Sequence, residues 1–536
     1  MNKGFDTEKR ILLAITLSMG FLFGYPYIVK WINPPKAAPQ EAKKPEGAPS
    51  QPEAPAQAAK AELPKAAPVQ RKEELSTVET PLWKAVFTNK GGGVKSWELK
   101  KYTAKNAPDS PVVNLGQTIA LKGSLDTRVM PEAGTYEDVV FDAASRETVL
   151  QEADAKEIVF TGTAVKGIRV EKRYRFTGNG YIMDAEVRLV NGGRETVSLK
   201  AQTALSGPAA VKDMTGYHSG PVIYDKENVI RHKEKEADKT GEAGPRWIGM
   251  EDKYFLAALM PSAQMRKAQA GWKTEAGATG SAASLDVPVA NLAPGTQVSF
   301  SYGVFMGPKE YDMLLAQKDS LEESIEFGLF SFLAKPSLVV LNFFKRYLAN
   351  YGVAIVVFTV ILKIVFYPLT KKSLDSMRGM KDIQPQLAAI KEKYKDNKER
   401  LNKEMMELYK RYKINPLGGC LPMVLQIPVF IALYEVLYVA IDLRHAPLGL
   451  WIRDLSDKDP YYITPIIMGA TMFLQQKMTP TTADPMQAKI MLFMPVIFTY
   501  MFLSFPSGLV LYWLVNNLLS IGQQYWIQRT PAAAKA

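Results

Sequence analysis

The sequence predicts a multi-domain membrane protein in which an α-helical transmembrane bundle is joined to a separate antiparallel β-sandwich domain. The first reason is the distribution of hydrophobic residues, which make up 47% of the 536 residues and concentrate at the start and in the last third of the chain. The second is the middle of the chain, where apolar and polar residues alternate as in half-buried strands. The third is Lys363, a single charge inside an apolar run long enough to cross a bilayer.

Residues 1–32 are predicted to form an N-terminal transmembrane anchor. An apolar stretch, residues 11–32, follows Lys9 and Arg10. It is longer than the core of a usual signal peptide, and no clean small-x-small site follows at once, which favours an uncleaved anchor over a cleaved signal peptide. Residues 33–74 are dominated by Pro and Ala. Such a composition cannot bury enough surface to fold and predicts an extended linker.

Residues 75–320 are predicted to form one large antiparallel β-sandwich. Short runs of β-type residues recur here, separated by turn residues at 89–93 and 191–193. In the run GIRVEKRYRF, apolar residues occupy one face and charged residues the other; the apolar set is Ile168, Val170, Tyr174 and Phe176. One face of each sheet is therefore expected to be wet.

Residues 321–335 are predicted to form an amphipathic helix lying along the membrane surface. Acidic residues come early, and apolar residues form one stripe made of Ile325, Leu329, Phe332 and Leu333. Pro336 is expected to close this helix. A buried helix of the β domain is the alternative.

Five further spans are predicted after the β domain, which gives six spans with the anchor and five in the core bundle. The first belongs to a second transmembrane region at 336–370, and spans three to six occupy 418–528, before a short tail at 529–536. The five apolar runs lie at about 352–369, 418–441, 461–478, 490–505 and 508–527.

Residues 371–417 are predicted to form a helical hairpin. Apolar residues recur at spacings of three and four on both sides of a turn at 395–398, which indicates two short antiparallel helices. An ordinary solvated linker helix is the alternative. The first helix would bury Met380, Ile383, Leu387, Ile390 and Tyr394, and the second Leu401, Met405, Leu408 and Tyr412.

Charge sets the expected orientation. The 371–417 segment carries about 13 Lys and Arg, against three in 442–459, so the positive-inside rule places the hairpin in the cytoplasm. Both termini are then expected on the cytoplasmic side of the membrane, and the β domain on the opposite side. The net charge of +12 could suggest nucleic acid, but its excess lies beside a hydrophobic span. A membrane-facing loop is therefore favoured, with no nucleic-acid partner.

Lys363 is the most informative candidate site residue. It interrupts the run from Gly352 to Leu369, where a charge costs about 2.5–3.5 kcal/mol on insertion scales. A lysine that reaches toward the headgroups is one interpretation. The other is a wet pocket inside the membrane, formed by Lys363 with Thr359 on the same helical face and with polar or amphipathic residues of other spans, namely Gln426, Trp513 and Asn516. For a single Asn or Gln, a structural interhelical hydrogen bond is the alternative.

Other site chemistries find little support. Cys420 is the single cysteine, so no intrachain disulfide can form, and the three histidines have no ligand-like spacing. No nucleotide-binding loop, zinc motif or nucleophile elbow is present. We expect no metal, no cofactor and no enzymatic activity. A solute transporter would need inverted repeats, and a carbohydrate enzyme would need a carboxylate or histidine constellation in the β domain; neither is evident.

Four long stretches resemble one family. They are YPLTKKSLDSM, INPLGGCLPMVLQIPVFIALY, WIRDLSDKDPYYITPIIMGATMFLQQKMTP and MPVIFTYMFLSFPSGLVLYWLVNN. In this order they closely resemble the YidC membrane protein insertase family, in its Gram-negative form with a large periplasmic domain. The resemblance covers essentially the whole chain and is strongest from about 335 to 528.

The resemblance implies an insertase and chaperone that moves segments of nascent proteins into the inner membrane, alone or with the Sec translocon. It implies a hydrophilic groove with a positive charge in the second span, usually arginine and here Lys363, and substrate contacts at positions like Thr359 and Trp513. It also implies that the β domain is a supersandwich and that the cytoplasmic hairpin is needed for activity. Membrane lipids are expected partners, and ribosome contact would be weak because the chain stops at RTPAAAKA.

Overall fold

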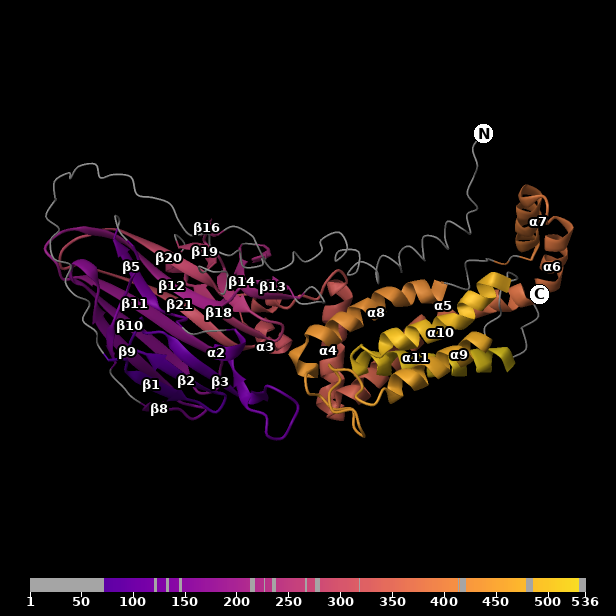
Figure 1. Cartoon of the computed structure of the whole chain (residues 1–536), viewed down its shortest axis with the longest axis horizontal. Helices are drawn as coiled ribbons and strands as arrows, with labels where there is room; N and C mark the ends of the chain where they lie inside the picture. Colours follow the sequence, from indigo (N-terminus) through magenta and orange to yellow (C-terminus); the bar gives the residue numbers. More distant parts are fainter. Residues whose placement is uncertain are drawn as a thin grey trace, which may run out of the picture. The chain divides into compact units, whose positions relative to one another are not determined.

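The computed structural model describes residues 72–529, apart from 120–122, 132–134, 144–146, 213–216, 226, 234–237, 266–267, 275–279, 318, 413, 415–420 and 479–484. The predicted anchor, the linker up to residue 71 and the tail beyond residue 529 lie outside the described residues. Residues 73–211 and 218–529 belong to one compact unit, which contains the β domain and the helical region (Figure 1).

The β domain begins at Leu75 and its last strand ends at Pro308. Two short helices, α2 (Leu115–Thr118) and α3 (Tyr311–Leu315), accompany the strands. The strands are β1 (Leu75–Glu79), β2 (Trp83–Thr88), β3 (Val94–Thr103), β4 (Val112–Asn114), β5 (Thr127–Pro131), β6 (Glu137–Asp138), β7 (Phe141–Ala143), β8 (Glu147–Val149), β9 (Ala155–Thr163), β10 (Ile168–Thr177), β11 (Ile182–Asn191), β12 (Val197–Pro208), β13 (Val211–Lys212), β14 (His218–Tyr224), β15 (Val229–Arg231), β16 (Lys239–Ala243), β17 (Trp247–Glu251), β18 (Phe255–Pro261), β19 (Gln269–Thr274), β20 (Gly280–Leu292) and β21 (Gln297–Pro308).

The strands form three sheets. A five-stranded sheet has the order β4-β3-β2-β1-β8, and a six-stranded sheet has the order β16-β19-β20-β12-β5-β6. The ten-stranded sheet runs β13-β14-β17-β18-β21-β11-β10-β9-β7, with β15 paired to β14. Strands β12 and β20 of the six-stranded sheet contact β14 and β17 of the ten-stranded sheet. Aromatic rings join the five-stranded and ten-stranded sheets, with Phe87 of β2 packed 5.1 Å from Tyr174 of β10.

Strand β10 shows the predicted alternation and one exception to it. Ile168, Val170, Tyr174 and Phe176 are buried, as the pattern predicts. Lys172 lies on the same buried face and is completely inaccessible. Its ammonium group donates hydrogen bonds to the backbone oxygens of Gly91 and Leu125. A buried charge costs much less when it is paired and hydrogen-bonded, which is how a lysine is accommodated in this core.

The helical region follows the β domain. Its helices are α4 (Ser331–Leu348), α5 (Tyr351–Asp382), α6 (Gln384–Lys393), α7 (Lys398–Arg411), α8 (Leu421–Val439), α9 (Ile463–Met478), α10 (Pro485–Phe502) and α11 (Ser507–Arg529). Within the described residues, α5 is the helix that is both long and apolar enough to cross a membrane by itself. Shorter apolar segments occur in α8 and α10, at Gln426–Val439 and Met491–Phe502.

The prediction of a helix at 321–335 closed by Pro336 is wrong. Residues Leu321–Ser324 form a single 3₁₀ turn, and α4 begins only at Ser331 and continues through Pro336 to Leu348. Proline in a helix removes one hydrogen bond and costs about 3 kcal/mol. The helix continues because the residues after the proline bury Leu338 and Leu341 completely. It ends where Ala349 adopts a left-handed conformation.

The boundary between the second span and the hairpin also differs from the prediction. The sequence predicts that the second transmembrane region ends at residue 370 and that the hairpin begins at residue 371, but α5 passes through Pro368 and continues to Asp382. Thr370 donates its hydroxyl to the Phe366 oxygen within this stretch. The hairpin therefore consists of α6 and α7, which are joined by the expected short turn.

The hairpin helices pack through a small apolar cluster. Its buried members are Ile383, Leu387, Met405, Leu408 and Tyr409, and Met380, Ile390, Leu401 and Ile414 pack against them. The structure therefore brings together seven of the nine hairpin residues that the spacing predicts to be buried. Tyr394 is only half-buried and Tyr412 is exposed, because both lie beyond the facing turns.

Gly469 gives a test of the packing between α9 and α10. A Cβ atom added there would overlap Thr499 Oγ1 and lie 3.1 Å from Thr499 Cβ. We therefore expect Gly469→Val to lower the free energy of unfolding by about 1–3 kcal/mol, as overpacking usually does. The measurement is thermal unfolding of the purified full-length protein in detergent. Gly522→Val in α11 is the matched control, since nothing lies within 4 Å of its Cβ position. Equal melting temperatures for the two variants would contradict the prediction.

Candidate functional site

Helix α11 is the element around which the candidate site is built. It contacts α5, α8 and α9, and α5 also contacts α8. The polar residues that the sequence analysis singled out come from α5, α8 and α11. These three helices are therefore mutual neighbours, as a shared pocket requires.

Lys363 lies on the side of α5 that faces α11. Its ammonium group donates a hydrogen bond to Ser520 Oγ of α11, with an N to O distance of 2.6 Å. The next two residues, Ile364 and Val365, are 67% and 63% exposed. Ile364 and Val365 therefore mark the exposed side of α5, and Lys363 lies where this side borders α11. Its ammonium group points at a neighbouring helix instead of along the exposed surface.

Ser520 connects Lys363 to Asn516. The Ser520 hydroxyl donates to the backbone oxygen of Asn516 at 2.7 Å, one turn earlier on α11. A hydroxyl has one proton to donate and lone pairs that accept, so it can serve both partners at once. The result is a short polar chain from Lys363 through Ser520 to Asn516. Asn516 itself is buried.

Thr359 lies on α5, one turn before Lys363, and is almost completely buried. Its hydroxyl donates to the Ile355 oxygen of its own helix at 2.7 Å. Such a bond to the carbonyl four residues earlier is common for threonine in helices. Thr359 therefore shares the face of Lys363, and its hydroxyl is used within α5.

Gln426 and Trp513 join α8 to α11 by different contacts. Gln426 Nε2 donates to the Tyr512 hydroxyl at 3.4 Å, a long hydrogen bond. The Trp513 ring lies 5.0 Å from the Phe430 ring of α8 in an edge-to-face arrangement. The rings of two residues of α10, Phe498 and Phe502, complete the aromatic cluster around it. Trp513 thus presents an apolar surface beside the polar chain.

Ser520 and Tyr512 are site residues that the sequence reasoning missed. Ser520 follows Asn516 by four residues and Trp513 by seven, so helical spacing places it on the same face. That spacing was a usable signal for Ser520. Tyr512 gives no comparable signal, because its contact with Gln426 depends on how α8 packs against α11.

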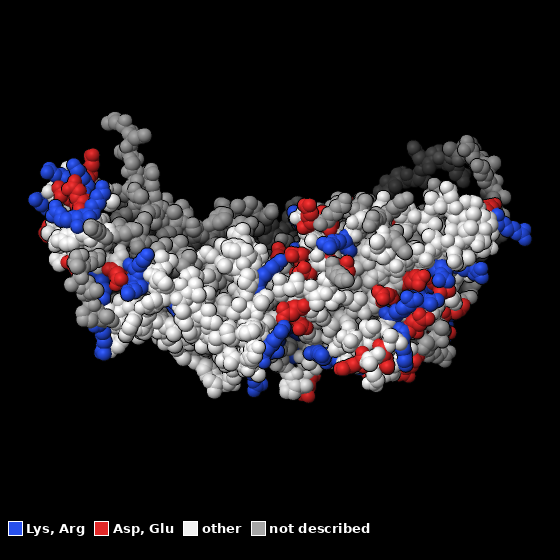
Figure 2. Space-filling model, turned by 180° about the vertical axis from the view of Figure 1, so that it is seen from behind, with Lys and Arg blue, Asp and Glu red and all other residues white. Residues whose placement is uncertain are grey.

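The surface of the helical region is strongly apolar. Large exposed hydrophobic side chains occur on several of its helices; examples are Ile466, Phe493, Val496, Ile497 and Tyr500. Figure 2 shows few charged side chains over the helices on the face it presents, while Lys, Arg, Asp and Glu gather on the hairpin. Soluble monomers rarely expose so many large apolar residues, so this surface indicates an apolar environment such as lipid.

Metal coordination finds no support in the described part of the chain. Within it, no group of three or more His, Cys, Asp and Glu residues is placed to hold a metal ion. The candidate site therefore consists of one cation, hydroxyl and amide groups, and aromatic rings. Such a set can attract negative charge and solvate polar groups.

Comparisons with known proteins agree on one family. Residues 343–534 match the model of the 60Kd inner membrane protein family, and residues 75–340 match that of the YidC periplasmic domain. The chain is 42% identical to the membrane protein insertase YidC of Geobacter metallireducens, over 99% of this chain and 100% of the relative. It is 43% identical to that of Syntrophus aciditrophicus, over 97% and 99%. A crystal structure titled as an active YidC insertase aligns with 85% of this chain and 95% of its own, at 18% identity and a TM-score of 0.37.

Proposed function

The chain belongs to the YidC membrane protein insertase family, and from this premise we propose how its residues insert nascent proteins. As a member of this family it is an inner-membrane insertase with a periplasmic domain, it acts on membrane proteins, and it is not an enzyme. The transporter and carbohydrate-enzyme interpretations are therefore set aside. The observation that carries the proposal is Lys363, held on the α11 side of α5 by Ser520.

We propose a hydrophilic groove between α5, α8 and α11 that opens to the cytoplasm and to lipid. Water and Lys363 would solvate the polar flank of a nascent segment while it is carried partway across the membrane. The apolar part of the segment would leave along the exposed side of α5, beside Ile364 and Val365, because its burial in lipid is favourable. Thr359, Gln426, Trp513 and Asn516 would line the path.

We also propose the finer topology that the sequence predicts. Helices α5, α8, α9, α10 and α11 would form the core bundle, and the anchor at 1–32 would be the sixth span. Both termini and the hairpin would then be cytoplasmic, and the β domain would be periplasmic. Its sheets would form a supersandwich, which the contacts of β12 and β20 with β14 and β17 support. The 33–74 linker would tether it to the anchor.

Helix α4 is proposed to lie at the periplasmic surface of the inner membrane. Its exposed side carries large apolar residues, among them Phe332, Phe343 and Tyr347. The last turn of the helix carries Lys345 and Arg346, which suit a headgroup region. The proposal that this segment is interfacial thus moves from 321–335 to Ser331–Leu348.

The remaining partners are proposals of the same kind. The exposed charges of the α6 and α7 hairpin suit a contact with the Sec translocon or, more weakly, with the ribosome. That contact would need the hairpin to keep its shape, which the cluster around Leu387 and Met405 maintains. Membrane lipids would surround the apolar surface of the bundle.

Site-specific photocrosslinking to a stalled nascent membrane protein tests the groove. We expect a photoreactive amino acid at Thr359, Gln426 or Trp513 to crosslink to the nascent chain, because all three positions would line its path. The same probe at Ile466 of α9 is the control, since that side chain is 59% exposed and belongs to none of the three helices of the proposed groove. Crosslinks that are equally strong at Ile466, or missing at all three groove positions, would contradict the proposal.

A further inference from the structure

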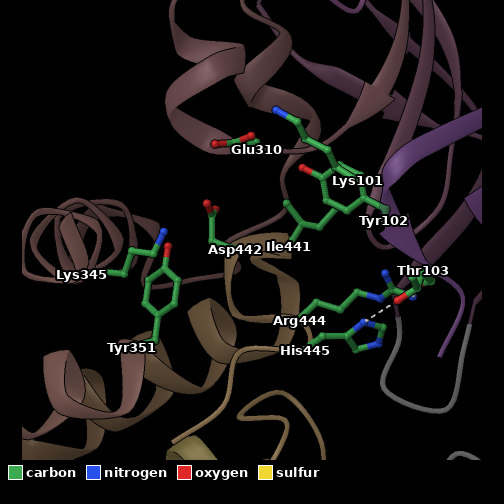
Figure 3. Close-up of a pocket in the computed structure, with 10 residues that line it drawn as sticks. All are labelled: Lys101, Tyr102, Thr103, Glu310, Lys345, Tyr351, Ile441, Asp442, Arg444 and His445. Carbon is green, nitrogen blue, oxygen red and sulfur yellow. Dashed lines mark hydrogen bonds between the residues drawn. The ribbon is translucent and has the colours of Figure 1, made fainter. Parts of the chain in front are cut away.

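A cavity of about 350 Å³ lies where the β domain meets the helical region (Figure 3). Its wall includes Lys101–Thr103 of β3, Glu310 before α3, Lys345 of α4 and the segment Ile441–His445. The segment is fixed to β3, because Arg444 donates hydrogen bonds to the backbone oxygens of Thr103 and Ala104 at 2.8 and 3.0 Å. Nothing in the insertase mechanism proposed above uses this cavity.

The cavity presents charges of both signs. Asp442 and Glu310 contribute carboxylates, and Lys345 and Lys101 contribute ammonium groups. A ligand with a single charge would meet like charge as well as opposite charge here. A ligand that carries both signs a few ångströms apart would find a partner for each.

Asp442 is the residue that most clearly indicates a ligand. Its carboxylate points into the cavity in Figure 3, and its Oδ2 atom is buried with no hydrogen-bond partner among the described residues. Burial, and then the nearby Glu310, raise the pKa of Asp442 to about 7. A buried carboxylate oxygen that lacks a donor is costly. A ligand that supplies N–H donors and positive charge would remove this cost.

Helix α4 places an apolar surface beside the cavity. Lys345 lines the cavity, and Phe343 and Tyr347 of the same helix are 52% and 75% exposed. A molecule whose charged end enters the cavity could therefore rest an apolar chain on α4. A molecule with a charged end and an apolar chain is typically a lipid.

We propose that the cavity binds a zwitterionic headgroup with a primary ammonium and a phosphate, as in phosphatidylethanolamine. The ammonium would donate to Asp442 and Glu310, and the phosphate would meet Lys345 and Lys101. A choline headgroup has the same charges but no N–H donors, so it would fit poorly. The inference rests on the proposed orientation, which puts residues 441–445 at the periplasmic surface of the membrane.

Native mass spectrometry of the full-length protein tests the site without using insertion activity. The probes are phosphatidylethanolamine, its N-monomethyl and N,N-dimethyl forms, and phosphatidylcholine, which differ stepwise in N–H donors. We expect retention to fall along this series, and Asp442→Asn to lower retention of phosphatidylethanolamine about tenfold or more, as expected for one charge-assisted hydrogen bond. Lys345→Gln, at an exposed position that should not affect folding, is expected to weaken all four lipids.

The controls separate this proposal from its alternatives. Asp375→Asn, at an exposed position near the other end of α5, should leave the series unchanged. Soluble glycerophosphoethanolamine distinguishes a lipid from a free solute: competition at matched concentration would assign the same headgroup chemistry to a solute. Equal retention of phosphatidylethanolamine and phosphatidylcholine, or an unchanged series in both Asp442→Asn and Lys345→Gln, would overturn the proposal. If the unchanged protein fails to insert clients into proteoliposomes but retains the four lipids in the expected order, the proposed function alone is contradicted.

Discussion

Replacing Lys363 with alanine is expected to reduce insertion of clients with acidic translocated segments about tenfold or more. A carboxylate near the centre of a bilayer costs about 2.5–3.5 kcal/mol on insertion scales. If the Lys363 cation recovers about half of that cost, its loss changes insertion about tenfold, because 1.4 kcal/mol corresponds to a factor of ten. The measurement is protease protection of the client after insertion into proteoliposomes that contain the purified protein.

The choice of clients and variants makes this result specific to charge. A client whose translocated segment has its acidic residues replaced by Asn and Gln should be inserted almost as well by Lys363→Ala as by the unchanged protein. Lys363→Arg should retain most activity because it retains the charge. Lys371→Ala, exposed further along α5, is the matched control. Equal loss for acidic and neutral clients would indicate a structural role through Ser520 and would remove the direct role of the charge.

The parts of the fold with strong local periodicity could be predicted from the sequence. The hairpin is the clearest case, because apolar residues three and four positions apart define one face of each helix. The structure packs Ile383 and Leu387 of that face against Met405 and Leu408. The alternation along β10 was equally readable, since Ile168, Val170 and Tyr174 are all buried. In both cases the local pattern and the tertiary packing agree.

The errors arose where tertiary packing overrides a local preference. The sequence predicts a helix end at Pro336, because proline removes a hydrogen bond and costs about 3 kcal/mol inside a helix. Pro336 instead lies inside the continuous helix α4. Burial of whole side chains after Pro336, such as Leu338 and Leu341, offsets that cost. The sequence shows the local cost but not the compensating burial.

The site shows the same limit. Lys363 was identifiable because a charge inside an apolar run is rare, but its partner Ser520 lies 157 residues away. Lys172 is a similar case in the β domain, where its partners Gly91 and Leu125 come from distant turns. A buried charge can be recognised from its local sequence, whereas the groups that compensate it come from distant parts of the chain.

Replacing Glu251 with glutamine is expected to lower the free energy of unfolding of the β domain by about 3–5 kcal/mol at pH 7. Glu251 is completely buried at the end of β17 and accepts from Lys309 Nζ at 2.6 Å and from Arg231 Nε at 2.7 Å. Lys309 is also completely buried. Glutamine keeps the shape but removes the negative charge, so the Lys309 cation would remain in the core without its counter-charge. The measurement is urea unfolding of the full-length protein in detergent, followed by tryptophan fluorescence.

A double variant and an exposed control isolate the ion pair. Glu251→Gln combined with Lys309→Met should recover most of the lost stability, since an apolar side chain can replace one member of a buried pair at little cost when the other charge is also removed. Glu227→Gln is the matched control, because Glu227 is exposed and follows β14, the strand that pairs with β17. A single variant within 1 kcal/mol of the unchanged protein would contradict the prediction.

The effect of Glu251→Gln should also depend on pH. Burial opposes the charge of Glu251, but Lys309 and Arg231 outweigh it and hold its pKa below the ordinary value. A carboxylate with a lowered pKa stabilises the fold above its unfolded pKa and loses this effect as the pH falls. Protonation removes the negative charge of Glu251 in the unchanged protein, as the substitution does at every pH. The difference in the free energy of unfolding between the unchanged protein and Glu251→Gln should therefore narrow in acid. Buried His218, whose pKa burial lowers to about 4, should destabilise both proteins as the pH falls from about 6.5 toward 4. A difference that stays constant down to the pH of acid unfolding would mean that the Glu251 charge is not its cause.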